Sequence, residues 1–424
     1  MKHALFLLLA FVAYGAAAQE NRTDVGVQFL GFATDFGTGV VSQVDQPDIW
    51  GRRLGFGGAV KLAGGVERPF FLEFGWSVLD GDSQSRAAQV LAAGTPLVFA
   101  TSVSPNGNMS LDSFADATGA FASAVVTLTS AGGGETGINS TTSSPLGGQT
   151  SVWAYSPTDG GGLFTSVVTD GTVGIARAVG LIFDETGAVM MTEGTDQHVP
   201  ATVTRSDNVT FRDGSVKLGT LVPLGNDWNA LPRGGLIMRS LERSTVLKQA
   251  IDIVDGFVVD DPTPELSIIQ NTDLRVDMAG VSIGSGFSRQ LSDAWRISFG
   301  ADIGVLQGRS RYTTHDAVWL DTNVAQNIAG PRGRADKVMQ TGRVSVGLSR
   351  QLKAGGVLSL GLYSDVTTGV PYLERVTLGE VIPVQSDDSS GTSLDVAEET
   401  NQDFRVRYGR MTNSGVSLAF VWVF

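Results

Sequence analysis

The chain has 424 residues, of which 42% are hydrophobic, and its formal net charge is −13 at pH 7. The acidic balance argues against a nucleic-acid partner, which needs a basic surface, and the hydrophobic content argues against a disordered chain. There is no cysteine and there are only three histidines, so we expect no disulfide, no metal site built from these residues and no cofactor.

The first 18 residues have the order of a secretory signal peptide. A basic start at residues 1–3 precedes an apolar run at 4–13, and the small residues 16–18 precede the predicted cleavage after Ala18. A helical anchor would need about 18 apolar residues, so this run is too short to span a bilayer. No other stretch predicts a spanning helix, and an exported chain could then cross a membrane only as a closed β-barrel.

Residues 25–33 predict a first strand, and residues 53–62 and 70–78 predict a hairpin. In the hairpin, large apolar side chains occupy every second position, and small or charged side chains occupy the positions between. Because a strand turns alternate side chains to opposite faces, one face suits lipid and the other suits an interior. The apolar set is Leu54, Phe56, Val60, Leu62, Phe70, Leu72, Phe74, Trp76 and Val78.

Residues 81–208 differ in character, because Ser, Thr and Gly dominate and no lipid-facing alternation persists. We interpret them as one large surface insertion between barrel strands, with short strands of its own. Connections of this length are normally functional or disordered. The alternative is that residues 173–183 and 188–192 add two strands to the barrel.

Barrel-like alternation returns in residues 209–424. Strands are predicted around residues 216–222, 236–243, 274–287, 295–305, 343–349 and 358–365. In the third of these the apolar parity changes after Met278, which predicts a β-bulge at Ala279-Gly280. A turn is expected at 225–235, and acidic outer loops are expected at 252–265 and 387–399, with a further loop after residue 305.

The last ten residues alternate in the same way. Val416, Leu418, Phe420, Trp422 and Phe424 are large and apolar, and smaller side chains separate them. An aromatic strand that ends in Phe resembles the C-terminal assembly signal of bacterial outer-membrane β-barrels. The resemblance is to this class of proteins, and it implies location in the bacterial outer membrane and insertion by the barrel-assembly machinery.

Counting back from the C-terminus gives an all-β, antiparallel transmembrane barrel of about ten strands, with twelve as the alternative. The short connections at 64–69, 225–235, 290–293 and 353–356 fall on one side, and the long ones fall on the other. This segregation is typical of outer-membrane barrels. The expected division is a signal peptide at 1–18, strands one to three at 19–80, the insertion at 81–208 and the remaining strands at 209–424.

If the apolar parity faces lipid, charged side chains of both signs face the lumen. A barrel of about ten strands is only slightly wider than a packed one, and buried charges must be paired. We therefore expect a lumen closed by ion pairs, with a narrow pore for small ions or solutes as the alternative. The predicted lumen network is Arg53, Lys61, Glu73, Lys217, Arg275, Asp277, Arg296, Asp302, Arg343 and Asp365.

The expected function is that of a non-enzymatic surface protein, structural or adhesive. It would contact outer-membrane lipid and lipopolysaccharide, and its outer loops would bind an extracellular ligand. A remote alternative is a surface hydrolase, in which His315 and Asp316 in the loop after residue 305, together with Asp80 and Asp82, would activate water. A solvated loop histidine is the simpler explanation.

Overall fold

The computed structural model describes residues 19–32, 49–62, 70–92, 97–100, 107–130, 135–143, 148–156, 161–183, 187–195, 198–251, 266–320, 323–352, 356–378, 384–385, 392–395 and 401–423. Over these ranges the protein is all-β, and they contain no helix. No helix that could cross a membrane occurs among them. The predicted signal peptide, the terminal Phe424 and the acidic loop at 252–265 lie outside the described residues.

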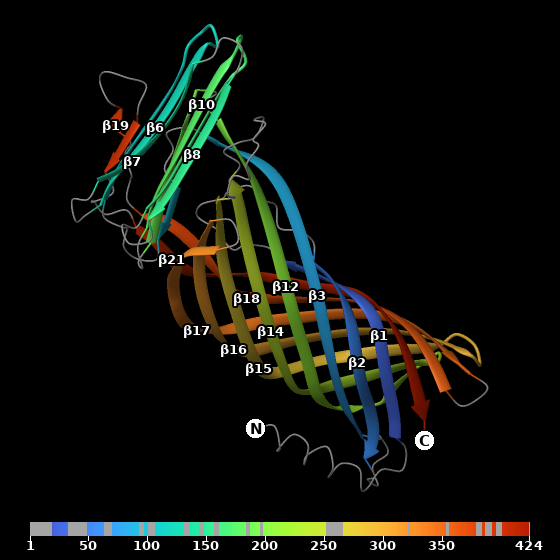
Figure 1. Cartoon of the computed structure of the whole chain (residues 1–424). Helices are drawn as coiled ribbons and strands as arrows, with labels where there is room; N and C mark the ends of the chain where they lie inside the picture. The colour runs from blue at the N-terminus through green and yellow to red at the C-terminus, as the bar shows by residue number, and fades with distance from the viewer. Residues whose placement is uncertain are drawn as a thin grey trace.

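Ten long strands and one short strand form the larger sheet, and every pairing in it is antiparallel. Its order is β12-β3-β2-β1-β21-β18-β17-β16-β15-β14-β13, and β12 also pairs with β14. Figure 1 shows this sheet curled on itself. The strands are β1 (Gln19–Phe32), β2 (Ile49–Leu62), β3 (Phe70–Ala92), β12 (His198–Thr220), β13 (Val222–Gly225), β14 (Trp228–Ile251), β15 (Leu266–Gln290), β16 (Trp295–Leu320), β17 (Asn323–Gln351), β18 (Gly356–Leu378) and β21 (Asn401–Val423).

Strand β15 keeps one register with both neighbours along its whole length, so the predicted bulge at Ala279-Gly280 is wrong. The parity of the apolar residues changes because the surroundings change. Val276 and Met278 are buried on the inner face, whereas Val281 and Ile283 are exposed on the outer face. One straight strand therefore carries an apolar inner face at one end and an apolar outer face at the other.

The turn predicted at 225–235 is much shorter in the structure. Asn226 and Asp227 have φ angles of 52° and 63° and connect β13 to β14, which begins at Trp228. Two consecutive residues in the left-handed region, of types that tolerate it, match the tight turns that suit the twist of a hairpin. The residues that follow belong to a strand of the sheet.

The loop expected after residue 305 is instead a continuation of two strands. β16 runs to Leu320 and β17 begins at Asn323, and the two remain paired up to Leu320↔Asn323. The outward positions here are polar or charged, as at Arg309, Arg311 and Thr313. The lipid-type alternation therefore stops while the strands continue.

Two smaller five-stranded sheets lie beyond one end of the large sheet (Figure 1). Their apolar inner faces share one core, to which each sheet contributes residues such as Met109 and Val126 on one side and Val167 and Ala176 on the other. Two sheets packed face to face form a β-sandwich. Its strands are β4 (Leu97–Ala100), β11 (Gly187–Gly194), β10 (Gly174–Phe183), β9 (Gly161–Thr169) and β8 (Gly148–Ser156) in one sheet, and β19 (Val384–Gln385), β20 (Thr392–Asp395), β5 (Gly107–Ala115), β6 (Phe121–Ser130) and β7 (Glu135–Ser143) in the other.

The sandwich differs from the predicted insertion in its limits and its composition. β3 and β12 remain paired as far as Ala92↔His198, so the large sheet extends past the predicted boundaries at 81 and 208. The segments proposed as two extra barrel strands, β10 and β11, belong to the sandwich. The acidic region between β18 and β21 also contributes to it, because β20 pairs with β5.

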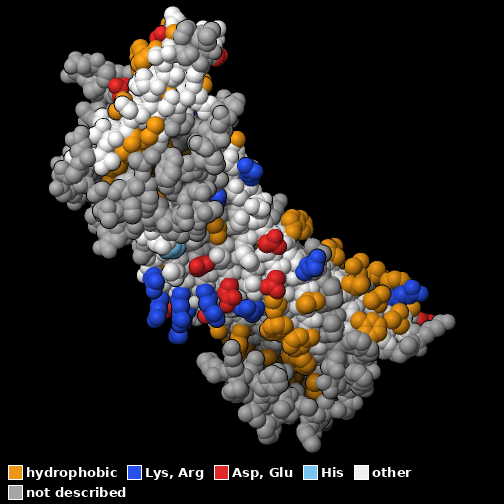
Figure 2. Space-filling view, in the orientation of Figure 1, with side chains coloured by type: hydrophobic (Ala, Val, Ile, Leu, Met, Phe, Trp, Pro, Cys, Tyr) orange, Lys and Arg blue, Asp and Glu red, His pale blue; other side chains and the backbone are white. Residues whose placement is uncertain are grey.

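Exposed apolar side chains, which we call the apolar belt, occur on strands β2, β3, β12, β14, β15, β16, β17, β18 and β21 of the large sheet. Figure 2 shows them on one face, in the part of this sheet farther from the sandwich. Leu54, Ile283, Ile303 and Val344 are each about 60% exposed, and they come from four different strands. Exposed apolar patches that extend over many strands are rare on soluble monomers, and they mark contact with a membrane or with a partner.

Candidate functional site

The space enclosed by the large sheet is the candidate site, and charged side chains meet in it close to the short connections. Lys217 Nζ lies 2.9 Å from Asp302 Oδ1, and Arg233 Nη2 lies 2.9 Å from Asp302 Oδ2. Arg233 Nη1 also lies 3.1 Å from Glu73 Oε2. Two cations thus meet two carboxylates from strands β12, β14, β16 and β3, and we call this group the lower ion cluster.

A second group, the middle ion cluster, is centred on Arg239. Its Nε donates to Asp213 Oδ1 at 3.0 Å, and its Nη1 and Nη2 donate to the two carboxylate oxygens of Asp365. The hydroxyls of Thr341 and Thr367 accept further hydrogen bonds from Nη1. Arg343 Nη1 lies 3.3 Å from Asp213 Oδ2. The Arg239 side chain is 4% exposed, and it connects β14 with β12, β17 and β18.

Tyr363 completes this cluster. The guanidinium carbons of Arg53 and Arg343 lie 4.9 Å and 4.8 Å from the centre of its ring. Cations at this distance are attracted to the electron-rich ring face, and the attraction is stronger where water is excluded. Two like charges are thereby both held against one aromatic ring within the interior.

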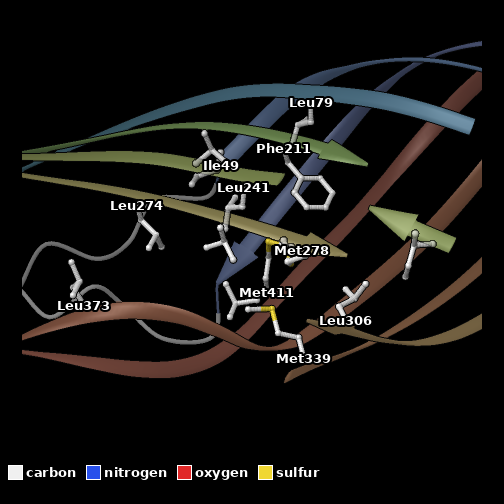
Figure 3. Packing of buried hydrophobic residues seen from close by; sticks show 14 residues of the cluster. Ile49, Leu79, Phe211, Leu241, Leu274, Met278, Leu306, Met339, Leu373 and Met411 are labelled. Atoms are coloured by element: carbon white, nitrogen blue, oxygen red, sulfur yellow. The ribbon is translucent and has the colours of Figure 1, made fainter. Parts of the chain in front are cut away.

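An apolar layer also fills the enclosed space. Figure 3 shows its side chains converging from strands around the wall, among them Leu79, Phe211, Met278 and Met411. Tight packing of this kind leaves few voids larger than a water molecule. The full cluster of buried members is Ile49, Leu79, Val209, Phe211, Ile237, Leu241, Leu274, Val276, Met278, Leu306, Met339, Val370, Leu373 and Met411.

A further ion pair group lies nearer to the sandwich, on β12 and β14. Arg205 Nε and Arg243 Nη2 lie 2.9 Å and 2.6 Å from the carboxylate oxygens of Asp207, and the Thr245 hydroxyl donates to it at 2.6 Å. All these side chains are almost completely buried. Charged clusters and an apolar layer therefore succeed one another along the interior.

Six of the ten residues predicted for the lumen network are brought into the lower and middle clusters. Lys61 and Arg296 are exposed, and Arg296 donates to Gln290 beside the turn at 291–294. Arg275 and Asp277 are wrongly placed by the prediction: their side chains are 55% and 50% exposed and point away from the buried face of β15. The six that meet in the clusters are Arg53, Glu73, Lys217, Asp302, Arg343 and Asp365.

The sequence prediction missed the residues that hold the clusters together, namely Asp213, Arg233 and Arg239. Arg233 was assigned to a turn, although β14 already includes it. The sequence pattern could have placed Arg239 in the interior. Leu236 and Met238 are apolar and face outward, and Arg239 has the opposite parity in the same strand. Of the predicted assembly signal, Phe420 and Trp422 lie in β21, where they pair with Leu358 and Gly356 of β18.

The hydrolase alternative fails to assemble in the described structure. His315 and Asp316 are consecutive in β16, and they point to opposite faces, the first exposed and the second buried. Asp80 and Asp82 lie on β3, and β12, β14 and β15 separate that strand from β16. Among the described residues, no three His, Asp or Glu side chains are grouped as metal ligands would be.

No protein-family model and no curated protein matches the sequence. Among solved structures, the outer membrane protease OmpT from Escherichia coli matches with 7% identity and a TM-score of 0.27, covering 77% of this chain and 96% of that one. A Pseudomonas aeruginosa FadL homologue matches with 11% identity and a TM-score of 0.18, covering 96% and 89%. A mutant of the TodX monoaromatic hydrocarbon channel matches with 8% identity and a TM-score of 0.21, covering 96% and 90%. Likenesses at these scores carry no conclusion about this chain's function.

Proposed function

We propose that the chain is a bacterial outer-membrane protein whose large sheet is a closed transmembrane barrel of ten strands. The first strand of the chain, β1, pairs with the last one, β21. The strands β12 and β14 stand at opposite ends of the order of long strands in the sheet and also pair with each other. The apolar belt would provide a surface for the lipid, and closure would leave no unpaired strand edge within it. The signal peptide and the terminal aromatic strand provide the route of export and of insertion by the barrel-assembly machinery.

The barrel, in this proposal, anchors the sandwich and does not conduct. The observation that carries it is the filled interior, in which the ion clusters and the apolar layer occupy the space between the strands. A pathway for solutes would need a continuous polar lining, and the apolar layer interrupts it. Opening one would also separate the ion pairs that now meet in the interior.

The sandwich would then be the functional part, exposed at the cell surface as a structural or adhesive module. It lies at the end of the strands opposite to the short connections and beyond the apolar belt (Figures 1 and 2). The acidic region between β18 and β21 strengthens its attachment, because β20 completes one of its sheets. An extracellular ligand would bind to the sandwich and the outer connections.

Single cysteines test this orientation, since the natural chain has none. Val173 is 55% exposed at a turn of the sandwich, and Ser292 is exposed in a turn at the opposite end of the barrel. We expect a membrane-impermeant thiol reagent to label V173C in intact cells, and S292C only after the outer membrane is opened. Labelling of S292C but not V173C in intact cells would refute the proposed orientation.

A further inference from the structure

Three arginines stand directly opposite one another on the outer face of the large sheet. The register pairs Arg275 of β15 with Arg311 of β16, and Arg311 with Arg334 of β17. Neighbouring strands are about 4.8 Å apart, so the three charges form a short row. Like charges placed directly opposite destabilise a strand pair. A bound anion would reduce the repulsion between these three arginines.

Most of these arginines have no acidic partner within the protein. Arg275 lies near Glu242 and Asp277, at 3.1 Å and 3.3 Å. In the part of the chain that the structure describes, no carboxylate oxygen lies within 4 Å of Arg309, Arg311, Arg332 or Arg334. The chain has 43 acidic residues against 30 basic ones, so acidic partners are not scarce. The register places Arg309 opposite Asp277 and Asp336, so the name arginine row is kept for Arg275, Arg311 and Arg334. Of these, Arg311 and Arg334 are left available to an external anion.

The arginine row borders the apolar belt on the side of the sandwich. On β17, the exposed Val338 is the last belt residue below Arg334 on this face. The four-residue step from Val338 to Arg334 spans roughly 14 Å of strand, and strand tilt shortens the distance along the membrane normal. The exposed Asp336 lies between the two on the same face. Figure 2 shows Lys and Arg side chains, with Asp and Glu side chains beside them, between the apolar surface and the sandwich. This is the level at which lipid headgroups begin.

A hollow of about 340 Å³ adjoins this row on the same face. Arg275, Arg311, Asn208, Thr210 and Thr313 line it, together with the carboxylates of Glu242 and Asp273. Guanidinium groups bind phosphate through two parallel hydrogen bonds, and hydroxyl and amide groups can donate to the remaining oxygens. Arg275 and Arg311 are therefore suited to a phosphate group, whereas Glu242 and Asp273 are suited to accept hydrogen bonds from hydroxyl groups of the polar body that carries it.

We propose that the arginine row binds the phosphate groups of a phosphorylated glycolipid in the outer leaflet. This inference rests on the proposed membrane insertion, which sets the row at headgroup level. The bound lipid would neutralise the opposed charges and fix the height of the barrel in the membrane. The committed partner is the lipid, whose acyl chains can lie against the belt while its phosphates reach the arginines.

Binding to the purified full-length protein in zwitterionic detergent tests the proposal. Native mass spectrometry would measure binding of bisphosphorylated lipid A, of the same lipid without its phosphates, and of inorganic phosphate. We expect R311Q/R334Q to bind bisphosphorylated lipid A about tenfold more weakly, because two charge-assisted hydrogen-bonding groups are lost. R350Q is the matched control, since Arg350 lies on β17 at the other border of the belt, 5.4 Å from the Trp295 ring centre, and should leave binding unchanged.

Equal binding of the lipid with and without phosphates, or unchanged binding by the double variant, would overturn the proposal. Inorganic phosphate bound as tightly as the lipid would also overturn it, since the site would then be specific for the ion alone. If the double variant fails to fold, R311Q and R334Q are measured singly, and each should weaken binding about threefold. Insertion of the natural protein into vesicles is recorded in parallel: failure to insert counts against the proposed function, and insertion without phosphate dependence counts only against the lipid site.

Discussion

Arg239 shows what a single buried charge does in this protein. It contacts Asp213 and Asp365, which come from strands far apart in the sequence, and two threonine hydroxyls complete its surroundings. A buried ion pair adds little net stability over an apolar replacement, but removal of one partner leaves the other charge buried and uncompensated. The energetic importance of Arg239 therefore comes from the carboxylates that depend on it.

We expect Arg239→Met to lower the free energy of unfolding by about 3–5 kcal/mol, because both carboxylates lose their main partner. The matched control is Arg212→Met, whose exposed pair with Glu242 should contribute about 0–1 kcal/mol. Urea unfolding of the protein in detergent, followed by tryptophan fluorescence, measures both. Similar losses for the two variants would contradict the buried role of Arg239.

A turn in the sandwich carries a pH-dependent contribution. Hydrogen bonds from the Thr172 hydroxyl and from the amides of Thr172 and Val173 lower the pKa of Asp170 below its ordinary value. Since the folded pKa is the lower one, the stabilisation is fully present above the unfolded pKa of about 3.9 and is lost as the pH falls through the folded pKa.

We therefore expect Asp170→Ala to lower the thermal midpoint of the sandwich at pH 7, and the difference from the natural protein to shrink below about pH 4. Circular dichroism melts at a series of pH values measure it. Asp170→Asn, which keeps an acceptor oxygen but no charge, is the control and should show a smaller loss at pH 7. A difference between Asp170→Ala and the natural protein that is independent of pH would show that the carboxylate charge is unimportant.

At the scale of elements, the sequence predicts strands where one face meets an apolar medium and the other a packed interior. The hairpin of β2 and β3 and the alternation in β16 and β21 are of this kind. The outer halves of β15, β16 and β17 are not, because their outward residues are charged and their inward residues are apolar. The pattern there inverts or disappears although the backbone pairing continues, and this is why a bulge and a loop were wrongly predicted.

The pairing of β20 with β5 could not be predicted from local pattern, since only four residues of β20 make it and they lie more than 280 positions from their partners. We expect Ser393→Pro to remove a backbone donor from this short strand and to open the edge of β5. Hydrogen exchange in residues 107–115 should become faster, while β9 in the other sheet of the sandwich serves as an internal control. Unchanged protection of β5 would show that β20 does not cover it.

The ion clusters show which part of a site is accessible from sequence. Residues on clear strands, such as Glu73, Lys217 and Asp302, could be assigned to the interior by parity alone. Arg233, the partner of Glu73 and Asp302, lies in a stretch with Pro and Gly that predicts a turn. The order of the layers depends on which strands face one another across the lumen, and periodicity carries no information about that.

At the scale of the whole molecule, the proposal describes a barrel filled by ion clusters and an apolar layer, which anchors a β-sandwich outside the membrane. The two parts have separate cores, of which one lies between the small sheets and the other inside the large sheet. The sequence shows the division only as a change of composition. The chain passes between the two parts at the ends of β3 and β12. The segment between β18 and β21 connects them a second time, through the pairing of β20 with β5.

Conductance across a planar lipid bilayer tests the filled barrel most directly. Protein that shows a heat-modifiable shift on unboiled gels should insert and give no stable conductance steps. A variant that removes the middle of the apolar layer, with Met278, Met339 and Met411 changed to Gly, should admit ions if it still folds, which shows that inserted protein is detectable. Reproducible conductance steps from the natural protein would contradict the account and would favour a narrow pore.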